Sequence, residues 1–342
     1  KAVLYRPDAG PAPHVGILVM HRVANYLSHV ACTEFSRRGF AVLCMNSRFD
    51  NNEVRVVWEQ VALDVKAGVE YLRRQSGITR IVLFGHSGGA PTMSFYQAVA
   101  ENGVGFCQDP KRLTTCANDL AGLPRADGIV FADAHPGFPM TILRGFNPAI
   151  LDENDPSKVD PSLDPFDVKN GYNPKGESRY SPEFQQRYFA GQSARMNRLI
   201  DRALALRDKM KKGEHHYRDN DIVVIARGGN PVGGPGGVAS LHVLQPSLES
   251  IMATSRPQKL IRNDGTVATQ IIRSVAVPDP GQRESNATFD SGTKVYSVVS
   301  FLSSNAVRST NSLDGIDHCS SNNSTVCAVQ SITVPELFLA MG

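Results

Sequence analysis

A glycine-rich turn between an apolar run and a helix-like segment constrains this chain more than any other feature. The sequence GHSGG at positions 85–89 follows the run IVLF at 81–84 and precedes a helix-like stretch that begins near Pro91. A side chain on Gly85 or Gly89 would collide where strand and helix pack closely, which explains glycine at both positions. A G-x-S-x-G turn of this kind lifts its serine, here Ser87, above a sheet as a nucleophile. The backbone N–H of Gly88 then points to where an oxyanion forms. An ordinary glycine-rich turn is the alternative, and the flanking strand and helix favour the nucleophile.

The size and charge of the chain exclude several function classes. With 342 residues, 41% hydrophobic and 20% charged, it has the composition of a globular protein with one large domain or a core and a cap. A formal net charge of +3, with no clustered Lys/Arg run, argues against nucleic acid as a partner. No apolar stretch approaches the roughly 20 residues of a membrane span. Because the chain begins at Lys1, a leader could have been removed.

The six cysteines bear on the compartment. Two pairs bracket short polar loops and suit local disulfides, namely Cys107 with Cys116 and Cys319 with Cys327. Cys32 and Cys44 stand in apolar helix and strand contexts and are expected to be buried free thiols. Two disulfides would favour a periplasmic or secreted protein, and reduced cysteines a cytoplasmic one. The loop pairs lack the spacing of zinc ligands, and no metal site is expected.

The first 135 residues alternate strand-like and helix-like segments. Continuous apolar runs are typical of strands buried on both faces, and the periodic segments between them are typical of helices. This alternation predicts a mostly parallel, doubly wound α/β sheet. The predicted strands are Val15–Met20, Phe40–Met45, Ile81–Phe84 and Gly128–Ala132, and the predicted helices are Tyr26–Arg38, Val57–Arg74 and Pro91–Ala100.

Beyond residue 136 the pattern changes. The polar stretch Phe138–Tyr180 has no sustained period and is expected to wrap the surface. A long helix is predicted over Ser181–Lys212, and its apolar stripe indicates a core face that could also wall a pocket. The glycine-rich stretch 228–237 lacks the ending of a phosphate-binding loop and is interpreted as a flexible loop. A late core strand is predicted over Leu337–Met341, after Pro335.

These features together resemble the α/β-hydrolase fold, and within it a group of bacterial and fungal hydrolases known mostly as esterases. The shared strings are VMHR at 19–22, NSRFDNNE at 46–53, WEQ at 58–60, LFGHSGG at 83–89, FADAHPG at 131–137 and NDGT at 263–266. The resemblance implies a hydrolase core in residues 1–135, a large cap insertion with surface loops in 136–330, and a late core strand in 331–342.

The resemblance also implies the surroundings of Ser87. In this fold the loop after the first inner strand supplies the second oxyanion donor, by position the backbone N–H of Arg22 or Val23. His21, His86 and His135 are expected to line the pocket. For His21, a structural hydrogen-bonding role at a strand end is an equal alternative.

The partners of the serine are harder to place. The family order is serine, acid and then histidine, with both partners after the late strand. Because the chain stops at Gly342, we expect the last strand and helix of the fold, with the usual acid and base, to be missing from it. Within the chain, Asp133 is the candidate acid at the end of the strand after the elbow. His135 and His318 are the candidate bases, although His318 has the wrong chain order.

The resulting prediction is a serine hydrolase that cleaves a small carboxylic ester through an acyl-enzyme on Ser87, without a cofactor. The same nucleophile would serve an amidase, a lactonase or an acyltransferase. A scaffold that had lost its triad would be a binding protein. The sequence leaves the oligomeric state open, a homodimer included.

Overall fold

The computed structural model describes residues 1–155, 157–165, 167–173, 179–214, 221–226, 256–262, 264–271 and 294–339. The chain divides into two compact units. The first comprises Lys1–Leu143, Met196–Val223 and Val295–Met341, and the second comprises Arg144–Arg195 and Val224–Lys294.

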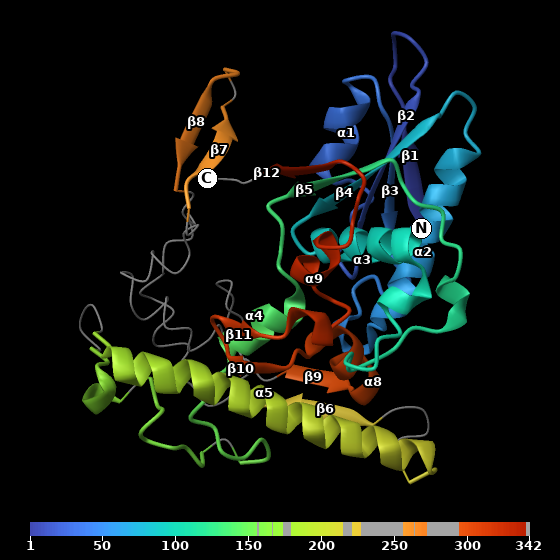
Figure 1. Cartoon of the computed structure of the whole chain (residues 1–342). Helices are drawn as coiled ribbons and strands as arrows, with labels where there is room; N and C mark the ends of the chain where they lie inside the picture. Colours follow the sequence, from blue (N-terminus) through green and yellow to red (C-terminus); the bar gives the residue numbers. More distant parts are fainter. Residues whose placement is uncertain are drawn as a thin grey trace. The chain divides into compact units, whose positions relative to one another are not determined.

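A six-stranded sheet forms the centre of the first unit, in the strand order β1-β3-β2-β4-β5-β12 (Figure 1). The strands are β1 (Ala2–Tyr5), β2 (Val15–His21), β3 (Ala41–Asn46), β4 (Arg80–His86), β5 (Gly128–Ala132) and β12 (Glu336–Leu339). Only β1 runs antiparallel to its neighbour within this sheet, and the other pairs are parallel. The mostly parallel α/β architecture predicted from the sequence is confirmed.

Helices cover both faces of this sheet. Those of the first unit include α1 (Val30–Ser36), α2 (Trp58–Arg73), α3 (Gly89–Asn102), α8 (Val298–Ser300) and α9 (Thr325–Val329). Leu18 and Met20 of β2 pack into a large cluster with residues of α2 and α3. Ile17 and Val19 point to the opposite face and pack with residues of α1. Because side chains alternate along a strand, a run that is apolar at every position buries both faces.

The helix predicted over Tyr26–Arg38 is shorter in the structure and begins at Val30. His29 stands at the N-cap, where its Nδ1 accepts the N–H of Ala31 at 3.2 Å. The preceding residues form a turn, in which the N–H of His29 donates to the carbonyl of Tyr26 at 3.2 Å. This turn brings the side chains of Tyr26 and His29 to His86.

The remaining strands lie outside the six-stranded sheet. The remaining elements are the helices α4 (Phe138–Gly145) and α5 (Pro182–Lys211), the π-helix Phe301–Asn305, and the strands β6 (Ile222–Ile225), β7 (Gln258–Ile261), β8 (Val267–Gln270), β9 (Lys294–Ser297), β10 (Ser309–Asn311) and β11 (Gly315–Ile316). Short 3₁₀ turns cover Glu53–Arg55, Val104–Phe106, Asn118–Leu120, Val168–Asn170 and His318–Ser320. The long helix predicted after Ser181 is confirmed as α5. In the parts of the chain described above, no helix combines the length and the apolar character needed to cross a membrane.

The apolar stripe of α5 packs as a core face. In the second unit, Tyr180, Phe184 and Tyr188 form one buried cluster, with the rings of Tyr180 and Phe184 stacked at 5.2 Å. These side chains are enclosed by one another and by their neighbours. The glycine-rich stretch 228–237 lies outside the described residues.

The prediction that Phe138–Tyr180 only wraps the surface is wrong at the start of that stretch. The segment opens with α4, and Met140, Leu143 and Phe146 are fully buried. These three apolar residues recur every third position, which is enough for a helix of two turns. A search for a sustained period misses an element this short, because the polar sequence that follows dominates the pattern.

The late strand is present, but as an edge strand. β12 pairs in parallel with β5 and lies at the end of the strand order. Leu337, Phe338 and Leu339 are 51%, 56% and 45% exposed, so this strand is not enclosed as a core strand. The ring of Phe338 stacks on that of Phe131 at 4.7 Å, which anchors the strand to one neighbour.

Three disulfides link the cysteines. The two predicted from the polar loops, Cys107–Cys116 and Cys319–Cys327, are present. Cys32 and Cys44, expected to be free thiols, form a third disulfide between α1 and β3. Both are completely buried, as expected from their apolar contexts. The sequence could not show that α1 packs on β3 and brings the two thiols together.

Removing the Cys32–Cys44 bridge should destabilise the first unit measurably. The double variant Cys32→Ala with Cys44→Ala frees a cross-link between residues 12 positions apart, and we expect the free energy of unfolding to fall by about 3 kcal/mol. Urea denaturation of the variant beside the unreduced wild type measures this. An unchanged denaturation midpoint would contradict the assignment of this bridge.

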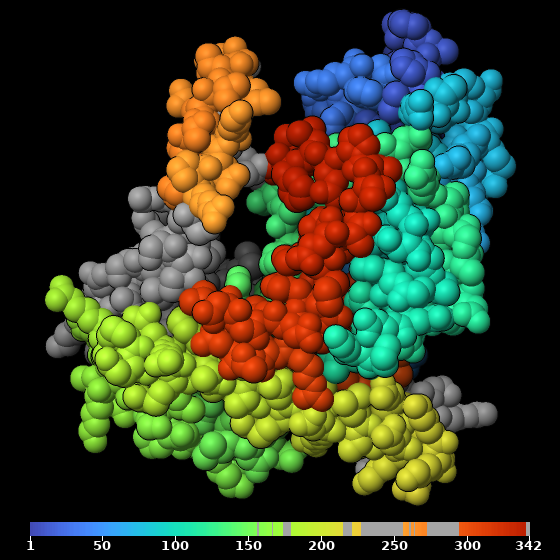
Figure 2. Space-filling model, viewed as in Figure 1, coloured from blue at the N-terminus to red at the C-terminus, as the bar shows by residue number. Residues whose placement is uncertain are grey.

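The C-terminal part of the first unit packs along the segment that follows α3. The N–H of Leu113 donates to the carbonyl of Ser320 at 2.9 Å, and the Arg112 guanidinium donates to the carbonyl of Ser321 at 3.1 Å. Figure 2 shows the segment after residue 294, in red, against the cyan-green segment that follows α3. This packing positions Thr325, which contacts the candidate site.

Candidate functional site

Ser87 occupies the turn between β4 and α3, with its side chain partly exposed. Its φ is 51°, in the left-handed region that costs a residue with a side chain about 1–3 kcal/mol. The N–H of Ser87 donates to the carbonyl of Ala132 at 3.1 Å, and its own carbonyl accepts the N–H groups of Ala90 at 3.0 Å and His135 at 3.2 Å. Hydrogen bonds to two neighbouring segments therefore hold this strained residue in place.

The glycines around Ser87 stand where strand and helix approach most closely. A Cβ on Gly85 would lie 2.7 Å from the Cα of Ala90, and one on Gly89 would lie 2.8 Å from the carbonyl oxygen of Met20. A Cβ on Gly88 would overlap the imidazole of His21. The steric reason given for glycine at positions 85 and 89 therefore holds in the structure.

Asp133 stands at the end of the neighbouring parallel strand. Ala132, the last residue of β5, pairs with His86 of β4, so Asp133 and Ser87 follow adjacent strand ends. Asp133 also adopts a left-handed conformation, with a φ of 47°, and its N–H donates to the carbonyl of Leu339 at 2.9 Å. Its side chain is exposed. The structure brings this candidate acid to the same edge of the sheet as Ser87.

His135 lies beside Ser87 through its backbone, while its ring is engaged elsewhere. Its Nδ1 accepts the N–H of Gly137 at 3.1 Å, which places the ring proton of the neutral form on Nε2. Nε2 lies 2.6 Å from the hydroxyl of Thr141 and donates to it. The hydroxyl of Thr325 donates to the carbonyl of His135 at 2.7 Å, which further fixes this loop.

His21 ends β2 and turns its imidazole toward Gly88. Its Nδ1 accepts the N–H groups of Val23 at 3.1 Å and Ala24 at 2.8 Å. Burial, followed by the positive charge of Arg22 and the nearby His135, His86 and His29, lowers the pKa of His21 to about 3. The ring is therefore neutral at physiological pH, with its proton on Nε2.

The depressed pKa of His21 predicts acid sensitivity. The unfolded chain takes up a proton on His21 near pH 6.5, whereas the folded protein does so only near pH 3. The unfolded state therefore binds more protons in this window, and the free energy of unfolding falls by up to about 1.4 kcal/mol per pH unit as the pH drops from 6.5 toward 3. Urea denaturation between pH 4 and 7 should show a shallower dependence for His21→Gln. Identical slopes for the two proteins would contradict the assigned protonation state.

The groups expected to supply the second oxyanion donor are the backbone N–H of Arg22 or of Val23, and the structure engages the second of these. The N–H of Val23 is directed at the ring of His21. Arg22 is buried and donates to Glu53 at 2.9 Å, with its guanidinium 4.2 Å from the ring centroid of Phe138. Burial lowers the pKa of Arg22, and the charge of Glu53 opposes that shift. The buried side chain of Arg22 thus contacts Glu53 and Phe138 directly after the end of β2.

His86 belongs to a cluster that was not predicted from the sequence. Its Nδ1 lies 3.2 Å from the hydroxyl of Tyr26 and 3.2 Å from Nε2 of His29. Because Nδ1 of His29 accepts the N–H of Ala31, Nε2 of His29 carries the proton and donates to His86. Burial raises the pKa of Tyr26 to about 12, which keeps its hydroxyl protonated as a donor. The sequence predicted a helix from Tyr26 onward, whereas this contact depends on the turn that precedes α1.

The candidate base His318 contacts the residue before Thr325. His318 is partly buried, and its Nδ1 lies 3.5 Å from the hydroxyl of Ser324. Among the residues that the structure describes, no group of three or more His, Cys, Asp or Glu side chains could hold a metal ion.

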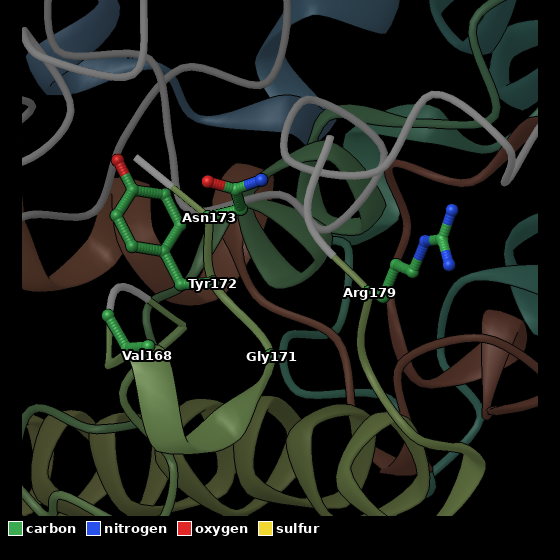
Figure 3. A pocket seen from close by; sticks show the side chains of 5 residues that line it. All are labelled: Val168, Gly171, Tyr172, Asn173 and Arg179. Atoms are coloured by element: carbon green, nitrogen blue, oxygen red, sulfur yellow. The ribbon is translucent and has the colours of Figure 1, made fainter. Parts of the chain in front are cut away.

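A separate pocket of about 510 Å³ lies in the second unit. Its lining consists of Val168, Gly171, Tyr172, Asn173 and Arg179 (Figure 3). None of these residues was a predicted site residue, and none carries a nucleophile of the kind that Ser87 provides.

Comparisons with known proteins give a likeness to esterases at low identity. No protein-family model matches the chain, and no curated protein matches it. Esterase B from Lactobacillus rhamnosis is 16% identical with a TM-score of 0.32, over 42% of this chain and 46% of that one. Est1E from Butyrivibrio proteoclasticus is 14% identical with a TM-score of 0.31, over 46% and 54% of the two chains. A carboxyl esterase from Bacillus coagulans is 16% identical with a TM-score of 0.27, over 42% and 44%. The chain spans about half the length of these structures, so the functional proposal rests on the chemistry of the site.

Proposed function

We propose that this protein is a serine hydrolase that cleaves small carboxylic esters. The observation that carries the proposal is the conformation of Ser87, a partly exposed serine with a φ of 51° between a buried parallel strand and a helix. A strained backbone conformation of this kind persists only where the surrounding contacts hold it in place, and such strain is concentrated at active sites. The close-packed glycines at 85 and 89 and the backbone bonds to β5 provide that support here.

In the proposed reaction, the Ser87 hydroxyl oxygen forms a bond to the ester carbonyl carbon, and the carbonyl electron pair moves to its oxygen. The N–H of Gly88, at the N-cap of α3, faces the developing oxyanion. Collapse of this intermediate breaks the bond to the alcohol, which leaves with a proton, and an acyl-enzyme forms on Ser87. Water then attacks the acyl carbonyl carbon and gives up a proton to the base, and collapse of this second intermediate breaks the bond to Ser87, whose oxygen regains a proton as the carboxylic acid leaves. No cofactor takes part in this scheme.

The general base must accept the Ser87 proton. The candidate residues differ in the hydrogen bonds that already occupy them. His135 donates through Nε2 to Thr141, so it could act only after its ring released that bond. Asp133 is kept as the proposed acid because it stands at the adjacent strand end. Substitution of His135 and of His318 by asparagine, with a pH–rate profile for each variant, tests each of them as the base.

The cap assignment for residues 136–330 is part of the same proposal.

The three disulfides favour an oxidising compartment, which suits a periplasmic or secreted enzyme.

Hydrolysis of p-nitrophenyl acetate, butyrate and octanoate tests the proposed function. We expect turnover that saturates with substrate, together with a rapid burst of p-nitrophenol of about one equivalent if deacylation is slow. The absence of turnover for esters, with release of amine from amides or of hydroxy acid from lactones instead, would move the activity to the other acyl-transfer classes. The absence of any acyl transfer would favour a binding role for this fold.

A further inference from the structure

The imidazole of His21 is held in one orientation by the backbone that follows it. The N–H groups of Val23 and Ala24 both donate to Nδ1, at 3.1 and 2.8 Å. Two donors on one nitrogen leave no room for a proton there, so the neutral ring carries its proton on Nε2. The amide of Val23, in the loop after β2, thus helps to fix the orientation of this ring.

The protonated nitrogen of His21 lies directly beside the nucleophile turn. A Cβ placed on Gly88 would overlap Nε2 of His21, with the ring's Cδ2 and Cε1 next nearest at 3.1 and 3.4 Å. The edge of the imidazole that carries the N–H therefore faces the residue after Ser87. Only glycine at position 88 leaves space between them.

The charge state of His21 suits a hydrogen-bond donor. The charged and titratable groups that act on it are Arg22, His135, His86 and His29, and each disfavours a second proton on the ring. A neutral imidazole in a fixed orientation donates one hydrogen bond without exchanging protons with the substrate.

We propose that His21 is a catalytic residue whose Nε2–H donates to the oxyanion formed on the Ser87 adduct, together with the backbone N–H of Gly88. This inference rests on the proposed function. As the serine oxygen bonds to the carbonyl carbon, the electron pair of the C=O bond moves to oxygen, and His21 stabilises that charge while keeping its proton. The amide of Val23, expected as a direct donor, instead positions the ring.

Three variants test this role on p-nitrophenyl butyrate. For His21→Leu we expect kcat to fall by about 10²–10³-fold with little change in KM, because the lost bond forms mainly in the transition state. His21→Gln retains an N–H donor and should recover part of the rate. His14→Gln, at an exposed position ahead of β2, is the matched control and should retain wild-type rates.

The thiono analogue of the same ester separates an oxyanion contact from a structural role. Sulfur accepts hydrogen bonds weakly, so the wild type should prefer the oxygen ester strongly, and His21→Leu should lose most of that preference. Equal losses on both substrates, or full activity of His21→Leu, would overturn the assignment while leaving the serine hydrolase intact. A wild type without turnover that depends on Ser87 would remove the proposed function, and this inference with it.

Discussion

Replacing Ser87 by alanine is expected to lower kcat for ester hydrolysis by about 10⁴-fold or more, with the fold intact. The reason is that no covalent intermediate can form without the hydroxyl, and only the oxyanion donors and substrate binding remain. Alanine keeps the Cβ that already occupies the left-handed conformation at this position, so the strained turn gains no new contact.

The matched control for this variant is Ser94→Ala on α3. Ser94 is completely buried, and its hydroxyl donates to the carbonyl of Pro91 at 3.2 Å, one turn beyond the elbow. This change removes one hydroxyl from the same helix and should leave kcat within about twofold of the wild type, since a local side-chain bond contributes only about 1 kcal/mol to stability. Retention of more than a tenth of the activity by Ser87→Ala would assign the hydrolysis to another residue.

Gly85→Ala is expected to cause a large loss of stability, although it adds only a single methyl group. The new Cβ would lie 2.7 Å from the Cα and 2.9 Å from the nitrogen of Ala90, and 2.9 Å from the carbonyl oxygen of Gly89. All three atoms belong to the backbone, so relief requires the start of α3 to move away from β4. We expect the free energy of unfolding to fall by about 3 kcal/mol, at the upper end for overpacking in a core.

Gly105→Ala is the control for that experiment. Gly105 lies in the 3₁₀ turn Val104–Phe106, and a Cβ there would meet nothing within 4 Å. Its free energy of unfolding should stay within about 0.5 kcal/mol of the wild type. Similar urea midpoints for the two variants would show that strand and helix are not packed as closely at position 85 as the structure indicates.

The sheet could be predicted well because its strands are buried on both faces. A run such as Val15–Met20 is apolar at every position, and its bounds in the structure differ by one residue. The contact between Gly85 and Ala90 follows from the same logic, because a strand that turns directly into a helix leaves no space for a side chain. The helix α4 was not predicted, because it is short. The edge position of β12 was not predicted, because it depends on which strands flank it in the sheet.

The surroundings of Ser87 were only partly predictable. Residues that follow strand ends, such as Asp133 and His135, could be placed near the serine from the topology of a parallel sheet. The contact of Tyr26 and His29 with His86 joins residues about 60 positions apart through a turn that the sequence predicted as the start of a helix. The Cys32–Cys44 bridge could not be predicted either, because it depends on how α1 packs on β3.

The most direct test of the central claim is the site of labelling by a fluorophosphonate on the intact protein. The probe reacts with a serine only when its hydroxyl is activated and an oxyanion site receives the phosphoryl oxygen. Peptide mass spectrometry should find the adduct on Ser87, with none in Ser87→Ala and a normal adduct in Ser94→Ala. Labelling at another serine, or no labelling of a folded protein, would contradict the assignment of Ser87 as the nucleophile.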